Sequence, residues 1–365
     1  GRGGVARADA AGTVAAKNTA IAKPRHMAPE STLPPDRRQV GRLAAVAEGA
    51  YGAGRFYDHN GEGSISMSYD RGNPLFKGSF VALITPFKDG AIDVAAYRKL
   101  IEWQIAEGTD GLVPTGTTGE SPTLSHDEHK QAVEICIEVA AGRVPVMAGT
   151  GSNSTAEAID YTRHAKEAGA DAALLAMPYY NKPTQEGMYQ HYKAVNDAVD
   201  LPQVIYNIPG RSVVDMSVET MARCAELPNV IGVKDATADL VRPMKTRLAI
   251  DADFTQLSGE DASVVPYLAQ GGHGCISVTA NVAPRPLAEM HDAWAAGDMD
   301  TVQAINERLM PLHDALFCES SPGPVKYAAE LLGLCDSATR LPLVEIADSS
   351  KQKVESALRS AGLLN

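Results

Sequence analysis

Residues 203 to 237 read QVIYNIPGRSVVDMSVETMARCAELPNVIGVKDAT, and this stretch contains two short apolar runs separated by a longer segment. The runs at 203–206 and 230–234 are rich in Val and Ile, which favours strands. The segment between them is long enough to hold a helix, as a crossover between parallel strands requires. The stretch therefore predicts a strand–helix–strand unit of a parallel sheet.

The same alternation continues over the rest of the chain from Ser79 onward. We count eight predicted strands, at 80–84, 111–114, 144–148, 172–176, 203–206, 230–234, 254–257 and 274–277. Eight strand–helix repeats over about 220 residues favour a closed (β/α)8 TIM barrel of the α/β class. A doubly wound open sheet is the weaker alternative.

Amphipathic segments between the strands predict the outer helices of the barrel, and residues 95–106 are one example. The apolar stripe of this helix is expected to comprise Ala95, Leu100, Ile101 and Ile105. Ser125 and Glu128 have the spacing of a capping box at the start of the next helix. Residues 283–365 exceed one closing helix, so we expect a last barrel helix followed by a C-terminal helical appendage.

Residues 1–66 differ in composition from the rest of the chain. They hold 14 Ala and 10 Gly, and they show no apolar repeat at the helical or the strand period. We predict that they are a disordered leader outside the fold. The predicted organisation is a leader over 1–66, a barrel over 67–282 and helices over 283–365.

The composition argues against several classes of function. The 365 residues include 33 Lys or Arg against 45 Asp or Glu, and a formal charge of -12 has the wrong sign for a nucleic-acid-binding protein. No apolar run approaches the roughly 18 residues of a membrane-spanning helix, so no membrane association is expected. The five cysteines include no C-x-x-C pair, which favours a reducing compartment and a cytoplasmic location.

Lys234 ends an otherwise apolar predicted strand. In a (β/α)8 barrel the active site lies at the carboxyl ends of the strands, so a lysine at that position is informative. It is either an edge lysine that reaches solvent or pairs with Asp235, or a nucleophilic amine in a dry site that attacks a ketone carbonyl.

Other polar residues also follow predicted strands. Tyr206 ends the preceding strand, where its phenol either relays protons or only forms a hydrogen bond. Arg211 comes next, and it either receives a substrate carboxylate or remains solvated. Residues 116–121 offer backbone N–H groups and Thr hydroxyls for a small carboxylate, although such segments also form caps and turns. Tyr179 and Tyr180 follow the fourth strand, so all these groups are predicted to converge on one barrel mouth.

Three other chemistries find weaker support. Phosphate-binding glycines of such barrels follow strands seven and eight, whereas residues 271–274 precede the eighth strand and belong to the opposite face. His126 and His129 lie three residues apart, but no third ligand is evident, so we expect no metal. The glycine-rich segments also do not match the G-x-G-x-x-G and P-loop patterns of nucleotide sites.

Four motifs carry a resemblance to a known family: G-T-T-G-E at 116–120, P-Y-Y-N-K-P at 178–183, Y-N-I-P-G-R at 206–211 and G-V-K-D-A-T at 232–237. From about Lys77 to Leu364 the chain resembles the dihydrodipicolinate synthase and N-acetylneuraminate lyase family. The resemblance implies a (β/α)8 barrel that forms a Schiff base with pyruvate and requires no cofactor. It also implies a homo-oligomer, by the family pattern a tetramer.

The threonine pair of the first motif and the arginine of the third favour the synthase branch of that family. This branch condenses pyruvate with L-aspartate 4-semialdehyde in the diaminopimelate route to lysine. The resemblance implies that Lys234 forms the imine, while protons pass from Tyr206 through Thr117 to Tyr180 of a neighbouring subunit. The implied substrate-binding residues are Thr118 for the pyruvate carboxylate, Ile276 over the imine and Arg211 for the carboxylate of aspartate semialdehyde.

Lysine-inhibited members of the family have an effector cleft at a subunit interface. This chain has matching polar groups at Ser121, His126, His129, Asn153, Glu157 and Tyr179. We therefore expect feedback inhibition by L-lysine, with Glu157 pairing with the effector ammonium and Tyr179 coupling the cleft to Tyr180. The alternative is a polar interface that binds no ligand, and Pro122 stands where Ala is common.

Two rival functions remain open from the sequence. Another pyruvate-dependent aldolase or lyase would share Lys234 and Tyr206 but use a different carbonyl partner, and Arg211 is the residue that distinguishes it. Gly210 and Ser212 depart from the commoner Ser and Thr beside that arginine. A non-catalytic homologue would be expected to have lost Lys234 or Tyr206, and both are present.

Overall fold

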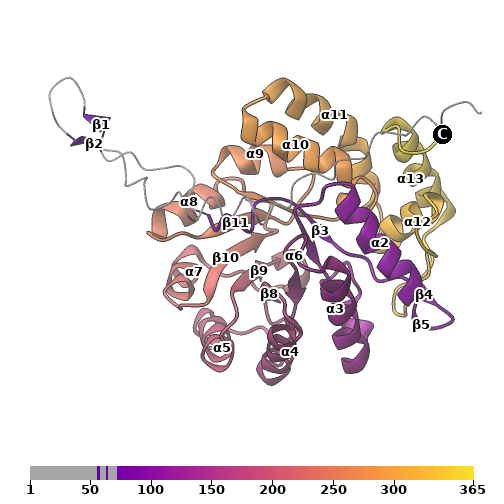
Figure 1. The fold of residues 1–365 in the computed structure, drawn as a ribbon. Helices are drawn as coiled ribbons and strands as arrows, with labels where there is room; N and C mark the ends of the chain where they lie inside the picture. Colours follow the sequence, from indigo (N-terminus) through magenta and orange to yellow (C-terminus); the bar gives the residue numbers. More distant parts are fainter. Residues whose placement is uncertain (1–55, 58–62, 65–71) are drawn as a thin grey trace, which may run out of the picture.

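The computed structural model describes residues 56–57, 63–64 and 72–365, and its centre is a closed parallel barrel (Figure 1). In order around the barrel, the eight strands are β6 (Gly111–Val113), β3 (Gly78–Ala82), β12 (Gly274–Ser277), β11 (Thr255–Ser258), β10 (Val230–Asp235), β9 (Gln203–Asn207), β8 (Ala172–Ala176) and β7 (Met147–Gly149). Leu112 forms a parallel bridge to Val146, which joins β6 to the segment leading into β7 and closes the barrel. The predicted (β/α)8 fold is confirmed, and the open sheet is wrong.

The predicted strands agree with the observed ones to within about two residues except at β7; β3, for example, covers Gly78–Ala82 and was predicted at 80–84. The sequence pattern places the start of this strand at Val144, whereas the strand begins at Met147. Pro145 lies between them and has no N–H to donate to a neighbouring strand. It contributes only its carbonyl oxygen, which accepts the N–H of Leu112 at 3.0 Å. Regular pairing therefore starts after the proline.

The register of β10 fixes the position of Lys234. In the sheet, Lys234 is paired with Tyr206 on β9 and with Leu257 on β11. Gly232 permits this close pairing, because a Cβ at that position would overlap the carbonyl oxygen of Thr255 on β11. Lys234 and Tyr206 therefore share the carboxyl end of the barrel, where (β/α)8 enzymes place their chemistry.

Helices alternate with the strands and cover the outside of the barrel (Figure 1). They are α2 (Val94–Ala106), α3 (His126–Ala140), α4 (Thr155–Ala168), α5 (Gln185–Ala198), α7 (Val218–Ala225), α8 (Arg242–Ala249), α9 (Val264–Ala269) and α10 (Pro284–Ala296). Three short helical turns follow strands at the carboxyl end: η1 (Ser121–Thr123), α6 (Pro209–Ser212) and η2 (Thr279–Asn281). These turns therefore lie beside the carboxyl ends of β6, β9 and β12.

The buried face of α2 differs in part from the predicted stripe. Its buried residues are Tyr97, Leu100, Ile101 and Gln104. Ala95 is exposed, so its assignment to the stripe is wrong. At 100° per residue, Ala95 lies about 160° around the helix from Tyr97 and faces solvent. The capping box of Ser125 and Glu128 at the start of α3 is confirmed, with both of its hydrogen bonds present.

Three further helices follow the barrel: α11 (Met299–Ala315), α12 (Gly323–Leu331) and α13 (Asp348–Ser360). Helix α11 packs against α10 and α13, and α13 packs against α12. Figure 1 shows α12 and α13 beside α2 and the hairpin of β4 (Phe87–Lys88) and β5 (Ala91–Ile92). The predicted C-terminal helical appendage is confirmed.

The prediction of a disordered leader over residues 1–66 lies almost wholly outside the described residues. Of that stretch, the structure describes β1 (Phe56–Tyr57) and β2 (Gly63–Ser64), which pair antiparallel in a two-stranded sheet of their own.

Within the described ranges, no helix combines the length and the apolar character needed to cross a lipid bilayer.

Large apolar side chains fill the inside of the barrel. This interior cluster comprises Phe76, Phe80, Ala82, Val113, Met147, Ala172, Leu174, Val204, Tyr206, Ala236, Leu257 and Ile276. Gly111 makes room for the ring of Phe80, because a Cβ on Gly111 would overlap that ring. Tyr206 belongs to this cluster and also reaches the barrel mouth, so the packed interior holds the phenol in place.

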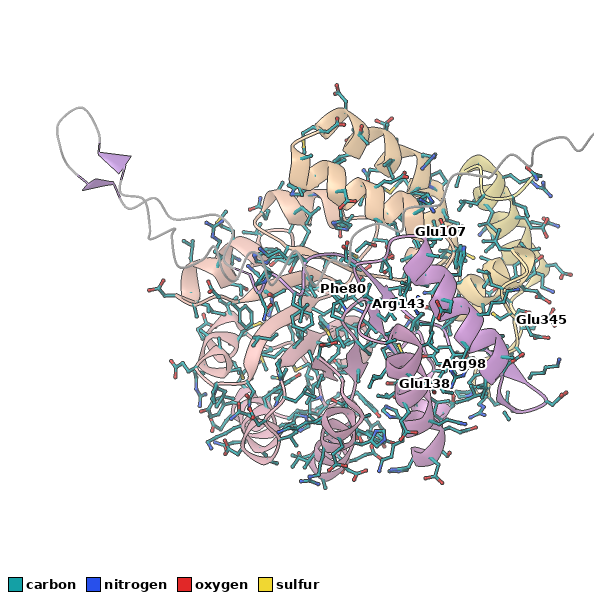
Figure 2. All side chains as sticks on the ribbon, in the orientation of Figure 1. Phe80, Arg98, Glu107, Glu138, Arg143 and Glu345 are labelled. Atoms are coloured by element: carbon teal, nitrogen blue, oxygen red, sulfur yellow. The ribbon has the colours of Figure 1, made fainter. Side chains whose placement is uncertain are left out.

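Exposed ion pairs join neighbouring helices on the outside. Arg98 of α2 pairs with Glu138 of α3, and Arg143 pairs with Glu102 of α2 at 2.8 Å. Figure 2 labels Arg98, Glu138 and Arg143 in the region where α2 and α3 lie side by side. Exposed pairs of this kind contribute on the order of 0–1 kcal/mol each, so the apolar layers provide most of the stability.

Candidate active site

The amine of Lys234 lies against the ring of Tyr206 at the carboxyl end of the barrel. Its Nζ is 4.3 Å from the ring centre, a distance at which the aromatic face attracts and orients an ammonium. Lys234 is 5% exposed and Tyr206 is 6% exposed. A lysine in this position is not a solvated edge lysine. A buried amine beside a phenol is suited to attack on a carbonyl with proton transfer.

A buried polar network lies beside Lys234. Asp235 accepts a hydrogen bond from the backbone N–H of Thr237 at 2.9 Å, and its carboxylate lies 3.9 Å from Nε of Arg242. Burial raises the pKa of Asp235. Arg242 also donates to Asp215 at 3.1 Å. These contacts of Asp235 differ from the Lys234–Asp235 pair, which is one form of the edge-lysine interpretation.

Gly259 lies beside Lys234, and the charge of Lys234 influences the following Glu260; the sequence predictions missed both residues. A Cβ on Gly259 would lie 3.2 Å from Cε of Lys234 and 2.7 Å from Cβ of Ala236, so a glycine is needed beside the lysine stem. Burial raises the pKa of Glu260, while the positive charges of Lys234 and Arg211 act in the opposite direction. Both residues directly follow β11, and this position at a strand end is the signal that could have identified them.

A pocket of about 240 Å³ opens at this end of the barrel. Its walls comprise Thr115, Gly116, Thr117, Ser121, Pro122, Gly149, Gly151, Leu174, Ala176, Met177, Tyr179, Tyr206, Ile208, Arg211 and Ser212. These residues lie in or just after β6, β7, β8 and β9. Of the groups predicted to converge, Thr117, Tyr179, Tyr206 and Arg211 line this pocket, whereas Lys234 and Thr118 are not among its lining residues. Ligand pockets commonly measure about 300–1,000 Å³, so this volume suits a small substrate.

Hydrogen bonds hold loop 116–121 in a compact turn. The N–H of Gly119 donates to the carbonyl of Gly116, and the N–H of Glu120 donates to the carbonyl of Thr117, both at 3.1 Å. Thr117 is half-buried and lines the pocket together with Tyr206. Thr118 is buried, at 5% exposure. The loop therefore places one threonine at the pocket wall and encloses the other.

Ile276 and Arg211 lie in contrasting surroundings. Ile276 on β12 is fully buried and belongs to the same interior cluster as Tyr206. Arg211 in α6 is exposed and lines the pocket. The next residue, Ser212, is buried, and its hydroxyl donates to the carbonyls of Ile208 and Val214 at 2.9 Å. This hydroxyl anchors the turn that carries the arginine.

Tyr180 projects away from the single chain. It is 88% exposed and has a φ of +70°, whereas the neighbouring Tyr179 is 36% exposed and lines the pocket. A backbone in the left-handed region is uncommon for an aromatic residue and requires support from its surroundings. Within one chain the structure thus brings Tyr179, but not Tyr180, to the pocket of Tyr206.

The residues predicted for the effector cleft lie close to this pocket. Ser121 and Tyr179 line the pocket itself. Nε2 of His126 lies 3.1 Å from Glu157, which also accepts a hydrogen bond from Ser152. Burial raises the pKa of Tyr179, and the negative charge of Glu157 adds to this rise. His126, Ser152 and Glu157 therefore form a polar cluster, and Tyr179 lies within the electrostatic influence of Glu157.

His129 and Asn153 complete the predicted set. The ring of His129 stacks on that of Tyr161, with 3.9 Å between the ring centres, and burial lowers the pKa of His129 to about 4. The carbonyl of Asn153 accepts a hydrogen bond from the side chain of Asn181 at 2.9 Å. Tyr161, which also stacks near His126, is a member of this cluster that the sequence predictions missed.

The glycine-rich segment 271–274 lies at the other end of the barrel, as predicted. Gly271, Gly272 and His273 line a cavity of about 810 Å³ together with Gly78, the first residue of β3. Among the described residues, no group of three or more His, Cys, Asp or Glu side chains is arranged to hold a metal ion.

Comparison with known proteins agrees with this geometry. The sequence profile described as "Dihydrodipicolinate synthetase family" matches residues 75–361. The 4-hydroxy-tetrahydrodipicolinate synthase of Rhodospirillum centenum is 66% identical over 290 residues, which cover 80% of this chain and 100% of the relative.

Solved structures show the same similarity. The dihydrodipicolinate synthase of Acinetobacter baumannii, complexed with pyruvate, gives a TM-score of 0.77 at 47% identity, covering 79% of this chain and 99% of that one. The enzyme from Cyanidioschyzon merolae with lysine bound gives a TM-score of 0.78 at 38% identity, covering 80% and 100%. The chain belongs to the dihydrodipicolinate synthetase family.

Proposed function

We propose that this protein is a lyase that condenses pyruvate with L-aspartate 4-semialdehyde through a Schiff base, in the diaminopimelate route to lysine. This is the activity after which relatives up to 66% identical are named. The observation that carries the proposal is the buried amine of Lys234, 4.3 Å from the ring centre of Tyr206 at the barrel mouth. We also propose a cytoplasmic location, because the five cysteines are free thiols and suit a reducing compartment.

The proposed reaction begins when the neutral amine of Lys234 attacks the ketone carbon of pyruvate. Loss of water gives a protonated imine, which acts as an electron sink. Removal of a proton from the methyl carbon then gives an enamine, which forms a carbon–carbon bond to the aldehyde carbon of the second substrate. The amino group of that substrate displaces Lys234 by transimination, which closes the six-membered ring and restores the free lysine.

Several of these steps move a proton, so a relay beside the amine is required. We assign the first member to Tyr206 and the second to Thr117, since both line the pocket. Tyr180 is assigned as the third member, reaching the site of a neighbouring copy. Its 88% exposure and its place beyond the pocket of its own chain support this assignment. The functional unit is therefore proposed to be a homo-oligomer, by the family pattern a tetramer.

Two carboxylates have to be held at the same end of the barrel. We assign the pyruvate carboxylate to Thr118 and the backbone N–H groups of its loop. The carboxylate of aspartate semialdehyde is assigned to Arg211, which lines the pocket and whose guanidinium is a two-pronged donor. Ile276 is assigned to pack over the imine and exclude water from it.

Borohydride reduction in the presence of pyruvate tests the proposal directly. We expect the mass of one reduced pyruvate adduct on the peptide containing Lys234, and no adduct in Lys234→Met. Consumption of aspartate semialdehyde is measured in parallel. An unmodified position 234 after reduction would contradict the mechanism.

A different pyruvate-dependent aldolase or lyase is the alternative, and Arg211 separates the two. Arg211→Ala is expected to raise the KM for aspartate semialdehyde by about 100-fold while pyruvate trapping at Lys234 continues. If Arg211→Ala uses aspartate semialdehyde as well as the unmodified protein does, another carbonyl partner becomes the better assignment.

We further propose feedback inhibition by L-lysine at the cleft formed by Ser121, His126, His129, Asn153, Glu157 and Tyr179. The ion pair of His126 with Glu157, and the influence of Glu157 on Tyr179, support a site for an amino acid, and a solved relative carries bound lysine. A lysine titration of activity is expected to show inhibition that Glu157→Gln weakens. Unchanged rates at millimolar lysine would contradict the proposal.

A further inference from the structure

A buried ion pair joins the C-terminal helices to the loop that carries the two threonines. Nζ of Lys326 on α12 lies 2.7 Å from a carboxylate oxygen of Glu120, the last residue of the G-T-T-G-E motif. The two side chains are 0% and 1% exposed. They are 206 positions apart in the sequence, so this contact exists only in the folded chain.

Lys326 is also packed against an aromatic ring in the protein interior. Its Nζ also lies 4.2 Å from the ring centre of Phe87 on β4. Burial lowers the pKa of Lys326, and Glu120 opposes that change. Buried ion pairs contribute little net stability, because desolvation offsets their attraction, and a packed apolar pair often serves as well. The distinctive contribution of this pair is therefore the fixed orientation that it gives to Glu120.

Arg340 holds the other side of the same segment. The second carboxylate oxygen of Glu120 accepts the backbone N–H of Arg340 at 3.0 Å. The guanidinium of Arg340 donates to the carbonyl of Thr123 at 3.0 Å and to both carboxylate oxygens of Glu128 in α3. This bidentate contact lowers the pKa of Glu128 to about 2. The region after the barrel thus contacts the chain on both sides of η1.

The orientation of Glu120 is transmitted to the threonines through the backbone. Glu120 has a φ of +56°, a strained value for a residue other than glycine, and its N–H donates to the carbonyl of Thr117. The carbonyl of Gly119 is fixed by the hydroxyl of Thr85 at 2.7 Å. A displacement of Glu120 would therefore move Thr117 and the adjoining Thr118.

We infer that Lys326 is a positioning residue for pyruvate: through its buried contact with Glu120 it fixes loop 116–121, so that Thr118 and the loop backbone meet the substrate carboxylate in one geometry. This inference rests on the proposed function. Lys326 lies outside the pocket and acts through Glu120 alone. Misplacement of a binding group by about 1 Å can cost about 100-fold in rate, so small shifts of this loop are measurable.

The first test is Lys326→Met, which keeps an unbranched side chain, one atom shorter, and removes the charge. We expect the KM for pyruvate to rise about tenfold, while kcat and the KM for aspartate semialdehyde change less than about threefold. A merely structural role would lower the active fraction, and hence kcat, without changing the KM for pyruvate. The matched control is Lys351→Met on α13, where a half-buried lysine outside the barrel mouth pairs with Glu345, and its kinetics are expected to remain unchanged.

Glu120→Gln keeps the test decisive if Lys326→Met does not fold. The amide keeps the shape of the side chain but presents an N–H group to one of its two donors, so we expect the KM for pyruvate to rise about fivefold. The double variant Glu120→Gln with Lys326→Met is expected to recover thermal stability without recovering this KM. A KM for pyruvate within twofold of the unmodified value in the folded variants would overturn the inference.

Borohydride trapping distinguishes failure of this inference from failure of the proposed function. If the unmodified protein forms no adduct at Lys234, the proposed function fails. If the unmodified protein and Lys326→Met both form the adduct with the same dependence on pyruvate concentration, the positioning role of Lys326 alone is rejected.

Discussion

At the scale of single residues, the site depends on what packs against Lys234. The ring of Tyr206 covers its amine at 4.3 Å, and Gly259 lies beside its Cε. Fixing a flexible lysine side chain costs about 2 kcal/mol in rotamer entropy. This packing restricts the side chain of Lys234 during folding, before the substrate binds. Lys234 is therefore positioned by packing contacts as well as by its electrostatic attraction to the ring of Tyr206.

Gly259→Ala tests this packing. The added methyl group would lie 3.2 Å from Cε of Lys234 and 2.7 Å from Cβ of Ala236, so the lysine has to shift. We expect the rate of imine formation with pyruvate to fall about 100-fold, with a folded protein by circular dichroism. Gly210→Ala is the control, because a Cβ at Gly210 meets no atom within 4 Å. Equal rates in the two variants would show that the packing around Lys234 is not limiting.

At the scale of elements, local signals in the sequence explain where helices begin. The capping box of Ser125 and Glu128 is present at the start of α3, with the Glu128 N–H donating to the Ser125 hydroxyl at 3.2 Å. The start of β7 was predicted less well, because Pro145 contributes a carbonyl oxygen but no N–H to the barrel. Periodicity alone does not distinguish a buried run from a hydrogen-bonded strand.

Ser125→Ala is expected to lower the free energy of unfolding by about 1 kcal/mol, because it removes the acceptor for the N–H of Glu128. Ser154→Ala is the matched control, since Ser154 occupies the same position before α4 but its side chain makes no capping hydrogen bond. Urea unfolding of the two variants measures the difference. Equal losses in both would contradict a specific role for the capping box.

At the scale of the whole molecule, buried histidines lower the stability of the folded chain in acid. Burial lowers the pKa of His129, His191 and His291 to about 4, below the ordinary value of 6.5. Between pH 6.5 and 4 the unfolded chain therefore binds more protons than the folded chain, and stability falls as the pH falls. We expect Tm to drop by about 5–10 °C over this window, measured by calorimetry in low-salt buffer. A Tm that stays constant from pH 7 to 4.5 would contradict this account.

The proposed exchange of Tyr180 between copies is also a property of the whole assembly. Tyr180→Phe and Lys234→Met are each expected to reduce activity strongly. Co-expression of the two variants in one cell is expected to restore about a quarter of the activity. If the two variants pair at random, about half of the dimers are mixed. One of the two sites in each mixed dimer has both Lys234 and Tyr180, so about a quarter of all sites are intact. No recovery in purified mixed oligomers would show that Tyr180 does not act across an interface.

The sequence by itself determined the eight strand–helix repeats and the residues that end each strand, because both depend on the local order of apolar and polar residues. Lys234, Tyr206 and Arg211 could be identified as candidates for this reason, and the structure places them at one barrel mouth. Their chemical roles rest on the family resemblance and on the experiments above.

Only the tertiary structure decided which distant residues touch. The pair of Glu120 and Lys326, the stacking of Tyr161 on His129 and the place of Gly259 beside Lys234 all join separate segments of the chain. No periodic pattern encodes such contacts, because they depend on barrel closure and on the packing of helices after the barrel. The orientation of the exposed Tyr180 likewise follows from its left-handed backbone, which the sequence around it does not reveal.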